Sequence, residues 1–533
     1  MNKTLISIFS AFLMAATSAA IDLDSLFVQS LGGPAAVDSL RRMTSYQAEG
    51  SVVLNGMPGR FVEYFVPPDR FYSRLEFGPV TIVQAYDGRI AWQRDMNGQV
   101  SRFEGFELDE ILKGLYFNSF SYLFPDRFEG SFGYQGELTK DGQRYHAVAF
   151  VPLQIDTVLG YFDVETGRLA LSTSFVDELP IHTYRRKFEE FGGIRWPTLL
   201  EVVAEGAPAS MQVEYETITL NEAIEHSIFT LPTLSSTDVG FHEGVDSVVV
   251  RFDYHAGHIR LPVVVNGSIK VWMILDSGAS GNILNKLLAD RFNLEVVGKM
   301  AAKGIGAYEE VEMVRVDSIS ISSLVLRDQV AGSLDLSTIS STGPDGDPFG
   351  GLLGYDFLSR FPILVNYQGS TLTIYNPETF EPANGGAEVD FFLTMKVPTV
   401  RAELNGLPGD FIVDLGNAFG LVIHHSFSEA HHLDTLLDHI DTIPLSIGGV
   451  GGMISGRTAY AASFRMGEVL IQSLRVLMPD SGQGLAGSEK LAGNIGNLVL
   501  ENFKILLDYA GSRLIFYEAD RTDMEPGESN DAE

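Results

Sequence analysis

Two short apolar segments that each end in an aspartate most constrain how this chain can fold. The first covers residues 271–276 and is followed by Ser-Gly-Ala-Ser, whereas the second covers residues 410–414 and is followed by Leu-Gly-Asn-Ala, about 140 residues later. An apolar run that ends in a polar residue close to a glycine is typical of a strand that enters a tight turn. The pattern therefore predicts two similar β units, each with a carboxylate at a strand end.

The two units share further landmarks in the same order and at a nearly constant offset. These are Pro262 with Pro398, Asn266-Gly267 with Asn405-Gly406, Leu353-Gly354 with Ile495-Gly496, and Thr373-Ile-Tyr375 with Ile515-Phe-Tyr517. Repetition at this scale indicates an internal duplication. We therefore expect one chain to supply both carboxylates of a shared site.

Asp276 and Asp414 are the candidate catalytic residues. Hydrolysis of a peptide bond without a metal or a thiol needs a base that activates water and an acid that protonates the leaving amine. Two adjacent carboxyl groups supply both, because they share one proton when the ionisation of both at short range is unfavourable. The alternative is structural, since aspartate close to glycine is common in turns.

The first unit resembles the retropepsin-like aspartic peptidases, in particular the bacterial secreted ones. The resemblance rests on Asp276-Ser-Gly-Ala-Ser280, on Gly351-Leu-Leu-Gly354-Tyr-Asp-Phe-Leu358 and on a closing strand at residues 363–375. With the second unit it covers residues 250–520. It implies two β-barrel lobes in which each aspartate loop is threaded against an apolar-apolar-glycine strand, a short helix at residues 356–361, and peptide hydrolysis without a cofactor.

The residues beside the first aspartate fit this resemblance. Gly278, and Gly416 in the second unit, permit backbone turns that a side chain would obstruct. Ser277 and Ser280 carry hydroxyl groups that can donate hydrogen bonds. The resemblance implies that Ser277 links the two motifs and that Ser280 supports Asp276 from outside.

The second unit departs from the pattern. Leu415 and Ala418 stand where the first unit has its two hydroxyl groups, and neither side chain can donate a hydrogen bond. We therefore expect Asp414 to lack stabilising hydrogen bonds and to have a higher pKa than Asp276. Asn417 is an alternative amide donor.

Glycine-rich stretches follow both motifs, at residues 304–308 and 448–452. A dinucleotide site would need a helix and a later acidic residue at a set spacing, and neither is evident. Hairpin tips are the simpler interpretation. By resemblance the first tip belongs to a flap over the substrate, with Gly304, Gly306 and Tyr308 as flap residues.

Three histidines of the second unit, His425, His432 and His439, are spaced by seven residues. On one helix they would share a face, which raises the alternative of a metal site. Residues 419–424 are however typical of a strand, and Ser426 is typical of a helix cap. We therefore expect a solvated histidine-rich helix face and no metal.

Residues 50–230 consist of short β-type segments separated by turn signals, which are Asn55-Gly56, Asp87-Gly88, Asn97-Gly98, Asp141-Gly142 and Gly192-Gly193. They predict an antiparallel, hairpin-rich sheet. Helical patterns cover residues 35–43 and 107–123.

The same region contains a set of short motifs, which are Gly32-Gly33, Leu40-Arg-Arg-Met43, Tyr86-Asp-Gly-Arg-Ile-Ala-Trp92, Tyr161-Phe-Asp-Val-Glu-Thr-Gly167 and Gly193-Ile-Arg-Trp-Pro197. Together they look like the lipoprotein-carrier-like half-barrels that precede aspartic peptidase domains in some exported bacterial proteins. A half-barrel can enclose an apolar cavity for a hydrophobic ligand or a lipidated peptide, and the alternative is a packed core.

Composition excludes several classes of protein. The chain has no cysteine, so disulfides, thiolate nucleophiles and cysteine-zinc sites are excluded. A formal net charge of -32 opposes nucleic acid binding. A hydrophobic content of 45% over 533 residues is enough for several cores and argues against general disorder.

The first twenty residues begin with a lysine, continue through an apolar stretch too short to span a membrane, and end in Ser18-Ala-Ala20. They predict a cleaved secretory signal and a periplasmic or secreted bacterial protein with no membrane span. The expected order is signal peptide 1–20, lipoprotein-carrier-like domain 21–231, linker 232–245, lobes 246–380 and 388–520, and an acidic disordered tail 521–533.

The sequence thus predicts a mainly β protein: two duplicated β-barrel lobes after an antiparallel half-barrel. The expected function is that of an exported, monomeric aspartic endopeptidase acting on a peptide or protein through Asp276 and Asp414. Two alternatives stay open. A peptide-binding protein would have lost the second-lobe chemistry, as Leu415 suggests, and a lipid or lipoprotein handler would act through the half-barrel.

Overall fold

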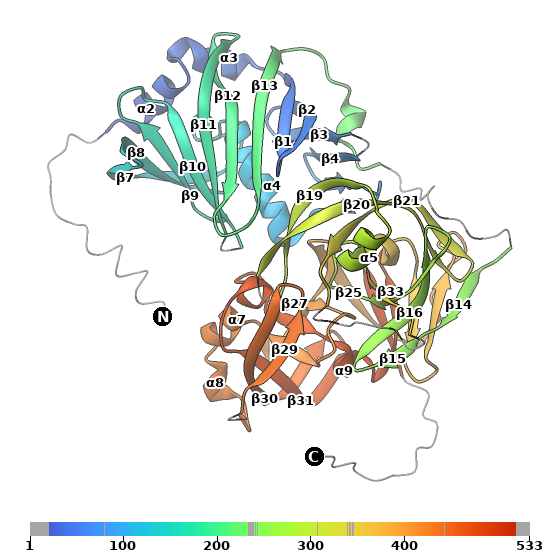
Figure 1. The fold of residues 1–533 in the computed structure, drawn as a ribbon. Coiled ribbons are helices and arrows are strands. Elements are labelled where there is room, and N and C mark those ends of the chain that lie inside the picture. Colours follow the sequence, from blue (N-terminus) through green and yellow to red (C-terminus); the bar gives the residue numbers. More distant parts are fainter. Residues whose placement is uncertain are drawn as a thin grey trace.

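The computed structural model describes residues 21–518, apart from residues 79, 178, 233–238, 240, 242–243, 306, 338, 340–342, 344–345 and 442. The fold is mainly β, as the sequence predicted, and consists of three large sheets (Figure 1). The predicted signal peptide, the acidic tail and much of the predicted linker lie outside the described residues. No described helix is long and apolar enough to cross a membrane.

The N-terminal sheet, β1–β13, is antiparallel throughout, in the order β6-β5-β4-β3-β2-β1-β13-β12-β11-β10-β9-β8-β7. Its strands are β1 Tyr46–Leu54, β2 Met57–Val66, β3 Arg70–Phe77, β4 Val80–Asp87, β5 Ala91–Arg94, β6 Val100–Arg102, β7 Gly130–Lys140, β8 Gln143–Pro152, β9 Val158–Asp163, β10 Leu169–Val176, β11 Leu179–Phe191, β12 Ile194–Ala204 and β13 Ser210–Leu220. All five turn signals fall between consecutive strands, so the hairpin prediction is confirmed.

Three helices pack against this sheet or its end: α2 Leu23–Ser30, α3 Pro34–Arg42 and α4 Gly105–Asn118. Leu40 of α3 and Leu115 of α4 share one apolar core with Phe61 and Ile194 of the strands. Both predicted helices are therefore present. The second ends at Asn118, earlier than predicted, because Phe120 adopts a left-handed backbone conformation (φ 55°) that ends a helix.

The first lobe contains an eight-stranded sheet in the order β15-β16-β17-β22-β18-β21-β20-β19. Its elements are β15 Asp253–His255, β16 His258–Val265, β17 Ile269–Leu275, β18 Ile283–Asn285, α5 Lys286–Arg291, β19 Val296–Lys303, β20 Tyr308–Ile321, β21 Leu324–Leu334, β22 Phe349–Leu353 and α6 Tyr355–Leu358. The short helix expected at residues 356–361 is α6.

The third sheet has thirteen strands, in the order β14-β24-β23-β33-β34-β25-β26-β27-β32-β28-β31-β30-β29. It contains the strands of the second lobe together with β14, β23 and β24, which come from the residues of the first lobe. Its elements are β14 Ser247–Arg251, β23 Ile363–Asn366, β24 Thr371–Tyr375, β25 Ala387–Thr394, β26 Val397–Leu404, β27 Leu407–Val413, β28 Leu421–Ile423, α7 His425–Ala430, α8 Leu433–Leu436, β29 Leu445–Gly449, β30 Gly452–Met466, β31 Val469–Pro479, β32 Gly493–Ile495, α9 Asn497–Leu500, β33 Phe503–Asp508 and β34 Arg513–Glu518. Two 3-10 turns, His226–Phe229 and Gly484–Gly487, complete the described elements.

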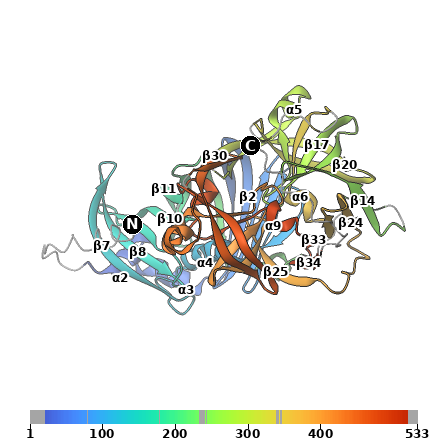
Figure 2. The ribbon, with the colours of Figure 1, turned by 90° about the horizontal axis from the view of Figure 1, so that it is seen from below.

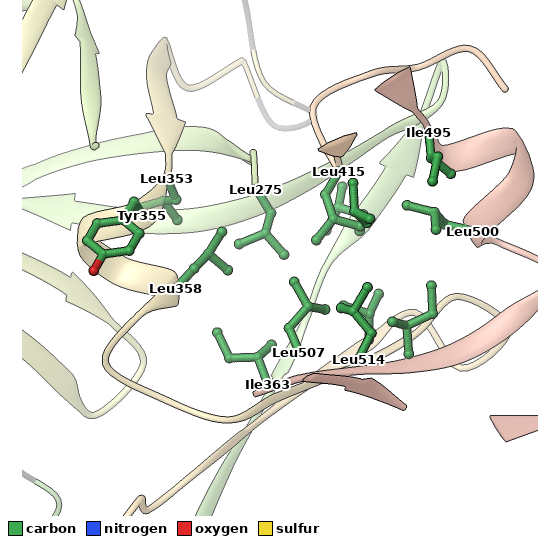
Figure 3. Close-up of a cluster of buried hydrophobic side chains, with 14 of the residues drawn as sticks. Leu275, Leu353, Tyr355, Leu358, Ile363, Leu415, Ile495, Leu500, Leu507 and Leu514 are labelled. Carbon is green, nitrogen blue, oxygen red and sulfur yellow. The ribbon is translucent and has the colours of Figure 1, made fainter. Parts of the chain in front are cut away.

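The two lobes meet on a shared platform. Strands β23 and β33, which follow the first and second motifs respectively, pair antiparallel, with Ile363 opposite Leu507. One apolar core runs from lobe to lobe above this pair (Figure 3). The platform fixes the two motif strands relative to each other.

In Figures 1 and 2 the hairpin β7–β8 of the N-terminal sheet lies at the end of the molecule remote from β14.

Candidate active site

Each candidate aspartate sits where a motif strand leaves its sheet. Strand β17 pairs in parallel with β22, and the amide N–H of Asp276 donates to the carbonyl of Leu353 at 2.9 Å. Strand β27 pairs in parallel with β32, and the amide N–H of Asp414 donates to Ile495 at 2.9 Å. The same backbone bond thus anchors both residues in equivalent settings.

The side chains of Asp276 and Asp414 are brought together, with their carboxyl groups in hydrogen-bond contact. Each carboxyl also fills the space beside the glycine of the opposite loop. A Cβ atom on Gly278 would lie 2.5 Å from Cγ of Asp414, and one on Gly416 would lie 2.4 Å from Cγ of Asp276. Any side chain at either glycine would collide with a carboxylate, so both glycines are required by this arrangement.

The surroundings of the pair raise the pKa of Asp276. Burial, followed by the charge of Asp414 and the hydrogen bond to it, raises the pKa of Asp276 well above its usual range. The donors differ between the two carboxyls. Asp276 accepts from the backbone amides of Gly278, at 2.9 Å, and Ala279, whereas Asp414 accepts from the amide of Gly416 at 2.8 Å and from Nδ2 of Asn494 at 2.7 Å.

The prediction that Asp414 lacks stabilising hydrogen bonds is therefore wrong. That prediction rested on nearby residues in the sequence, Leu415 and Ala418 with Asn417 as the alternative donor, whereas the extra donor comes from β32, eighty residues further along the chain. The expected order of the two pKa values stays a prediction.

Ser277 links the two loops, as the resemblance implied. Its buried hydroxyl donates to the carbonyl of Val413 at 2.7 Å and accepts from the amide of Leu415 at 2.9 Å. The second lobe has no equivalent hydroxyl, because its corresponding residue is Leu415, which packs in the shared core beside Leu275, Leu500 and Leu507 (Figure 3). The carbonyl of Leu415 accepts instead from Nδ2 of Asn497 at 2.6 Å.

The other two predicted support residues behave differently. Ser280 is exposed, and the described contacts of Asp276 do not include its hydroxyl, so the outer support expected from it is not formed. The amide of Asn417 reaches Asp414 only indirectly, because its Nδ2 donates to Oδ1 of Asn494 at 2.9 Å. Asn494 and Asn497 are site residues that the sequence did not single out.

Two hairpins with glycine-rich tips extend from the lobes. In the first, β19–β20, the amide of Ile305 at the tip donates to the carbonyl of Val450 at the tip of the second, β29–β30, at 2.8 Å. Ile305 packs against a second-lobe apolar cluster, and Val450 against a first-lobe cluster that contains Leu352. Gly304 and Tyr308 flank the first tip, and Gly306 lies outside the described residues.

The histidines of the second lobe do not form one helix face. His425 begins α7, which ends at Ala430, and His432 and His439 both have left-handed backbone conformations beyond it. His425 and His432 instead line an open groove of about 1650 Å³ in the second lobe. Within the described residues no group of three His, Cys, Asp or Glu side chains is arranged to hold a metal.

The sequence profile of the aspartyl protease family matches residues 261–357, which include Asp276 and the strand that anchors it. The second lobe and the N-terminal sheet lie outside this match. Among curated proteins no match was found.

Three solved structures illustrate the similarity of this chain to known folds. An aspartic proteinase from Irpex lacteus shares 13% identity, with 52% of this chain and 98% of that chain covered at a TM-score of 0.34. A putative outer membrane lipoprotein-sorting protein domain from Vibrio parahaemolyticus shares 11% identity, with 39% and 96% covered at a TM-score of 0.27. A LolA superfamily protein from Nitrosomonas europaea shares 13% identity, with 40% and 98% covered at a TM-score of 0.28.

Proposed function

We propose that this chain is an aspartic endopeptidase whose two carboxyl groups come from one polypeptide. The observation that carries the proposal is the direct contact of the Asp276 and Asp414 carboxyls, each packed against the motif glycine of the other lobe. An aspartate with only a structural role in a turn has no need of a second carboxyl as its hydrogen-bond partner. Two carboxyl groups this close cannot both ionise cheaply, so the contact favours a single proton shared between them.

The reaction follows from that shared proton. The ionised carboxyl takes a proton from water while the oxygen of that water attacks the peptide carbonyl carbon. The protonated carboxyl gives its proton to the carbonyl oxygen, and a tetrahedral diol forms. The carboxyl that took the proton from water then gives it to the peptide nitrogen, while the other carboxyl, now ionised, takes a proton from a diol hydroxyl. The C–N bond breaks, a carboxylic acid and an amine leave, and the pair again holds one proton.

Access for the substrate requires the hairpin tips to separate. Ile305 and Val450 are hydrogen-bonded to each other and packed into apolar clusters beside the motif strands. A peptide laid across the two aspartates would displace these tips. We propose flexible polypeptides as substrates, since a folded domain could not pass beneath two closed hairpins.

We also propose that the protein acts outside the cytoplasm, in the periplasm or as a secreted protein. The signal-like composition of residues 1–20 supports this location.

Hydrolysis of an unstructured protein by the purified full chain, followed between pH 3 and 7, tests the proposal. Asp276→Asn and Asp414→Asn should each lower kcat by roughly 10³-fold or more, because either change removes the base or the acid. The matched control is Asp410→Asn on the same strand β27. Burial raises the pKa of Asp410 too, but Asp410 lines the groove beside His425 and His432, so activity should persist.

The outcomes separate the alternatives. Peptide binding without hydrolysis, equal in wild type and both aspartate variants, would favour a peptide-binding protein. Hydrolysis that survives both substitutions would refute the aspartic mechanism. Binding of a lipid or lipidated peptide by a hydrolytically inactive chain would favour action through the N-terminal sheet.

A further inference from the structure

Asn494 occupies a position that is apolar in the first lobe. Strand β17 pairs with β22 so that Ile274 lies opposite Leu352, and β27 pairs with β32 so that Ile412 lies opposite Asn494. Leu352 and Asn494 are therefore equivalent places in the two lobes, one residue before the strand end that anchors each aspartate. The lobe without a hydroxyl at residue 418 is the lobe with this amide.

A series of hydrogen bonds runs from a backbone amide through two side-chain amides to Asp414, and each group donates to the next. The amide N–H of Phe419 donates to Oδ1 of Asn417 at 2.9 Å. Nδ2 of Asn417 then donates to Oδ1 of Asn494 at 2.9 Å, and Nδ2 of Asn494 donates to Oδ2 of Asp414 at 2.7 Å.

This order leaves no freedom in the orientation of either amide. A backbone N–H can only donate, so Asn417 must turn its oxygen toward Phe419 and its NH₂ group toward Asn494. Asn494 must then accept with its oxygen and present its NH₂ group to Asp414. Asn494 is buried, 4% exposed, and both ends of its amide are satisfied.

We propose that Asn494, held by Asn417, is a positioning residue that keeps Asp414 ionised and leaves the shared proton on Asp276. The inference rests on the proposed function and assigns roles within it. Asp414 becomes the carboxylate that takes the proton from water, and Asp276 becomes the acid that protonates the substrate carbonyl oxygen. An N–H donor aimed at a carboxylate stabilises its charged form, and Asp276 has no side-chain donor of this kind among its described contacts.

The other ionisable groups near the pair do not disturb this assignment. Burial lowers the pKa of His258, although the charge of Asp414 acts in the opposite direction, so the ring favours its neutral form. Its Nδ1 atom is buried and has no hydrogen-bond partner among the described residues. Burial raises the pKa of Tyr509 well above its usual range, so this group also stays neutral.

The substitution Asn494→Leu, which installs the first-lobe side chain, tests the proposal kinetically. We expect kcat to fall by roughly 10- to 100-fold with little change in KM. The acid limb of the pH profile reports the second protonation of the pair. Because the amide stabilises ionised Asp414, its loss should raise the midpoint of that limb by roughly one pH unit. Asn417→Ala should shift the limb in the same direction but less, since Asn494 keeps its place and loses only its orientation.

Asn502→Leu is the matched control, because within the described part of the chain Asn502 donates to the carbonyls of Leu498 and Val499 at the end of α9 and not to the aspartate pair. It should leave the pH profile unchanged, whatever its effect on the melting temperature. If Asn494→Leu does not fold, Asn417→Ala decides alone. Folded variants with wild-type acid limbs and wild-type kcat would overturn the proposal.

A readout that needs no activity separates this inference from the proposed function. The carboxyl signals of Asp276 and Asp414, followed by NMR in the ¹³C-labelled chain during a pH titration, should show Asp414 losing its proton first in wild type. Asn494→Leu should reduce or reverse this order. An inactive wild type with that order intact would refute the peptidase and keep the assignment, whereas an active enzyme with Asp276 ionising first would do the opposite.

Discussion

The raised pKa of Asp276 has a consequence for folding as well as for chemistry. A carboxyl whose pKa is higher in the folded than in the unfolded chain stabilises the fold below its unfolded value, about 3.9, and loses that contribution as the pH rises through the folded value. Burial beside Asp414 places Asp276 in this class. We expect Asp276→Asn to melt at a higher temperature than wild type at pH 7, with the difference vanishing below about pH 4.

Thermal unfolding of both proteins between pH 4 and pH 8 measures this difference directly. An amide cannot ionise, so the variant no longer carries the pH dependence of this one group. A difference in melting temperature that stays constant with pH would mean that folding does not raise the pKa of Asp276.

Ser277 and Ser280 offer a second comparison between neighbouring residues. Ser277 is buried and makes both hydrogen bonds between the loops, and Leu415 leaves it without a symmetric counterpart. Ser277→Ala strands the amide of Leu415 and the carbonyl of Val413, which should cost about 1–3 kcal/mol of unfolding free energy and lower kcat. Ser280→Ala removes only an exposed hydroxyl and should leave denaturant unfolding and kcat within error of wild type. Equal effects of the two changes would contradict the described brace.

At the residue scale, local spacing was informative where chemistry depends on neighbours in sequence. Asp276 and Asp414, with Gly278 and Gly416, could be singled out because each pair is two residues apart. Asn494 could not, because its partner is eighty residues away and its contact depends on strand pairing. One signal was available: alignment of the two units sets a lone amide against Leu352, inside a run that is otherwise apolar.

At the scale of elements, the sequence predicted hairpins better than short helices. Asn-Gly and Asp-Gly turns carry their own backbone preference for positive φ, so each marked a hairpin of the N-terminal sheet. Helices α7 and α8 have six and four residues, too few for a periodic pattern to identify. The three histidines spaced by seven residues therefore do not lie on one helix.

The two glycine-rich hairpins show what one unit alone cannot reveal. Each was predictable as a hairpin, but their contact depends on the packing of the lobes. Ile305 lies in the second-lobe cluster with Val422 and Leu477, and Val450 lies in the first-lobe cluster with Ile274 and Phe349. This reciprocal packing joins each hairpin tip to the apolar core of the opposite lobe, and under the proposed function a peptide would enter where these tips separate.

At the scale of the whole molecule, the N-terminal sheet is fastened to both lobes through two buried ion pairs of similar design. Asp177, after β10, pairs with Lys303 at 2.6 Å, and Asp95, after β5, pairs with Lys396 at 2.6 Å. Each lysine also lies over a tyrosine ring, Tyr308 for Lys303 and Tyr355 for Lys396. Only the first pair reaches a hairpin beside the aspartates.

Asp177 also binds the loop that lies under the first hairpin. It accepts from the hydroxyl of Ser488 at 3.0 Å and from the amides of Glu489 and Lys490. Burial alone would raise the pKa of Asp177, but Lys303 and these donors lower it overall, so the carboxylate is charged at neutral pH. One residue of the N-terminal sheet thus holds the base of the hairpin and the second lobe together.

Lys303→Met and Lys396→Met are therefore a matched pair of tests. Each removes the cationic partner of a buried carboxylate, and each should lower the unfolding free energy by a few kcal/mol, about 3. Lys303→Met alone should also speed hydrogen exchange at the amides of Gly304 and Ile305, which are bonded to Ala307 and Val450 in the closed hairpins. If closure limits substrate entry, kcat/KM for an unstructured protein should rise in Lys303→Met and not in Lys396→Met. Equal exchange rates at these amides in the two variants would show that the N-terminal sheet fastens the lobes without holding the hairpin shut.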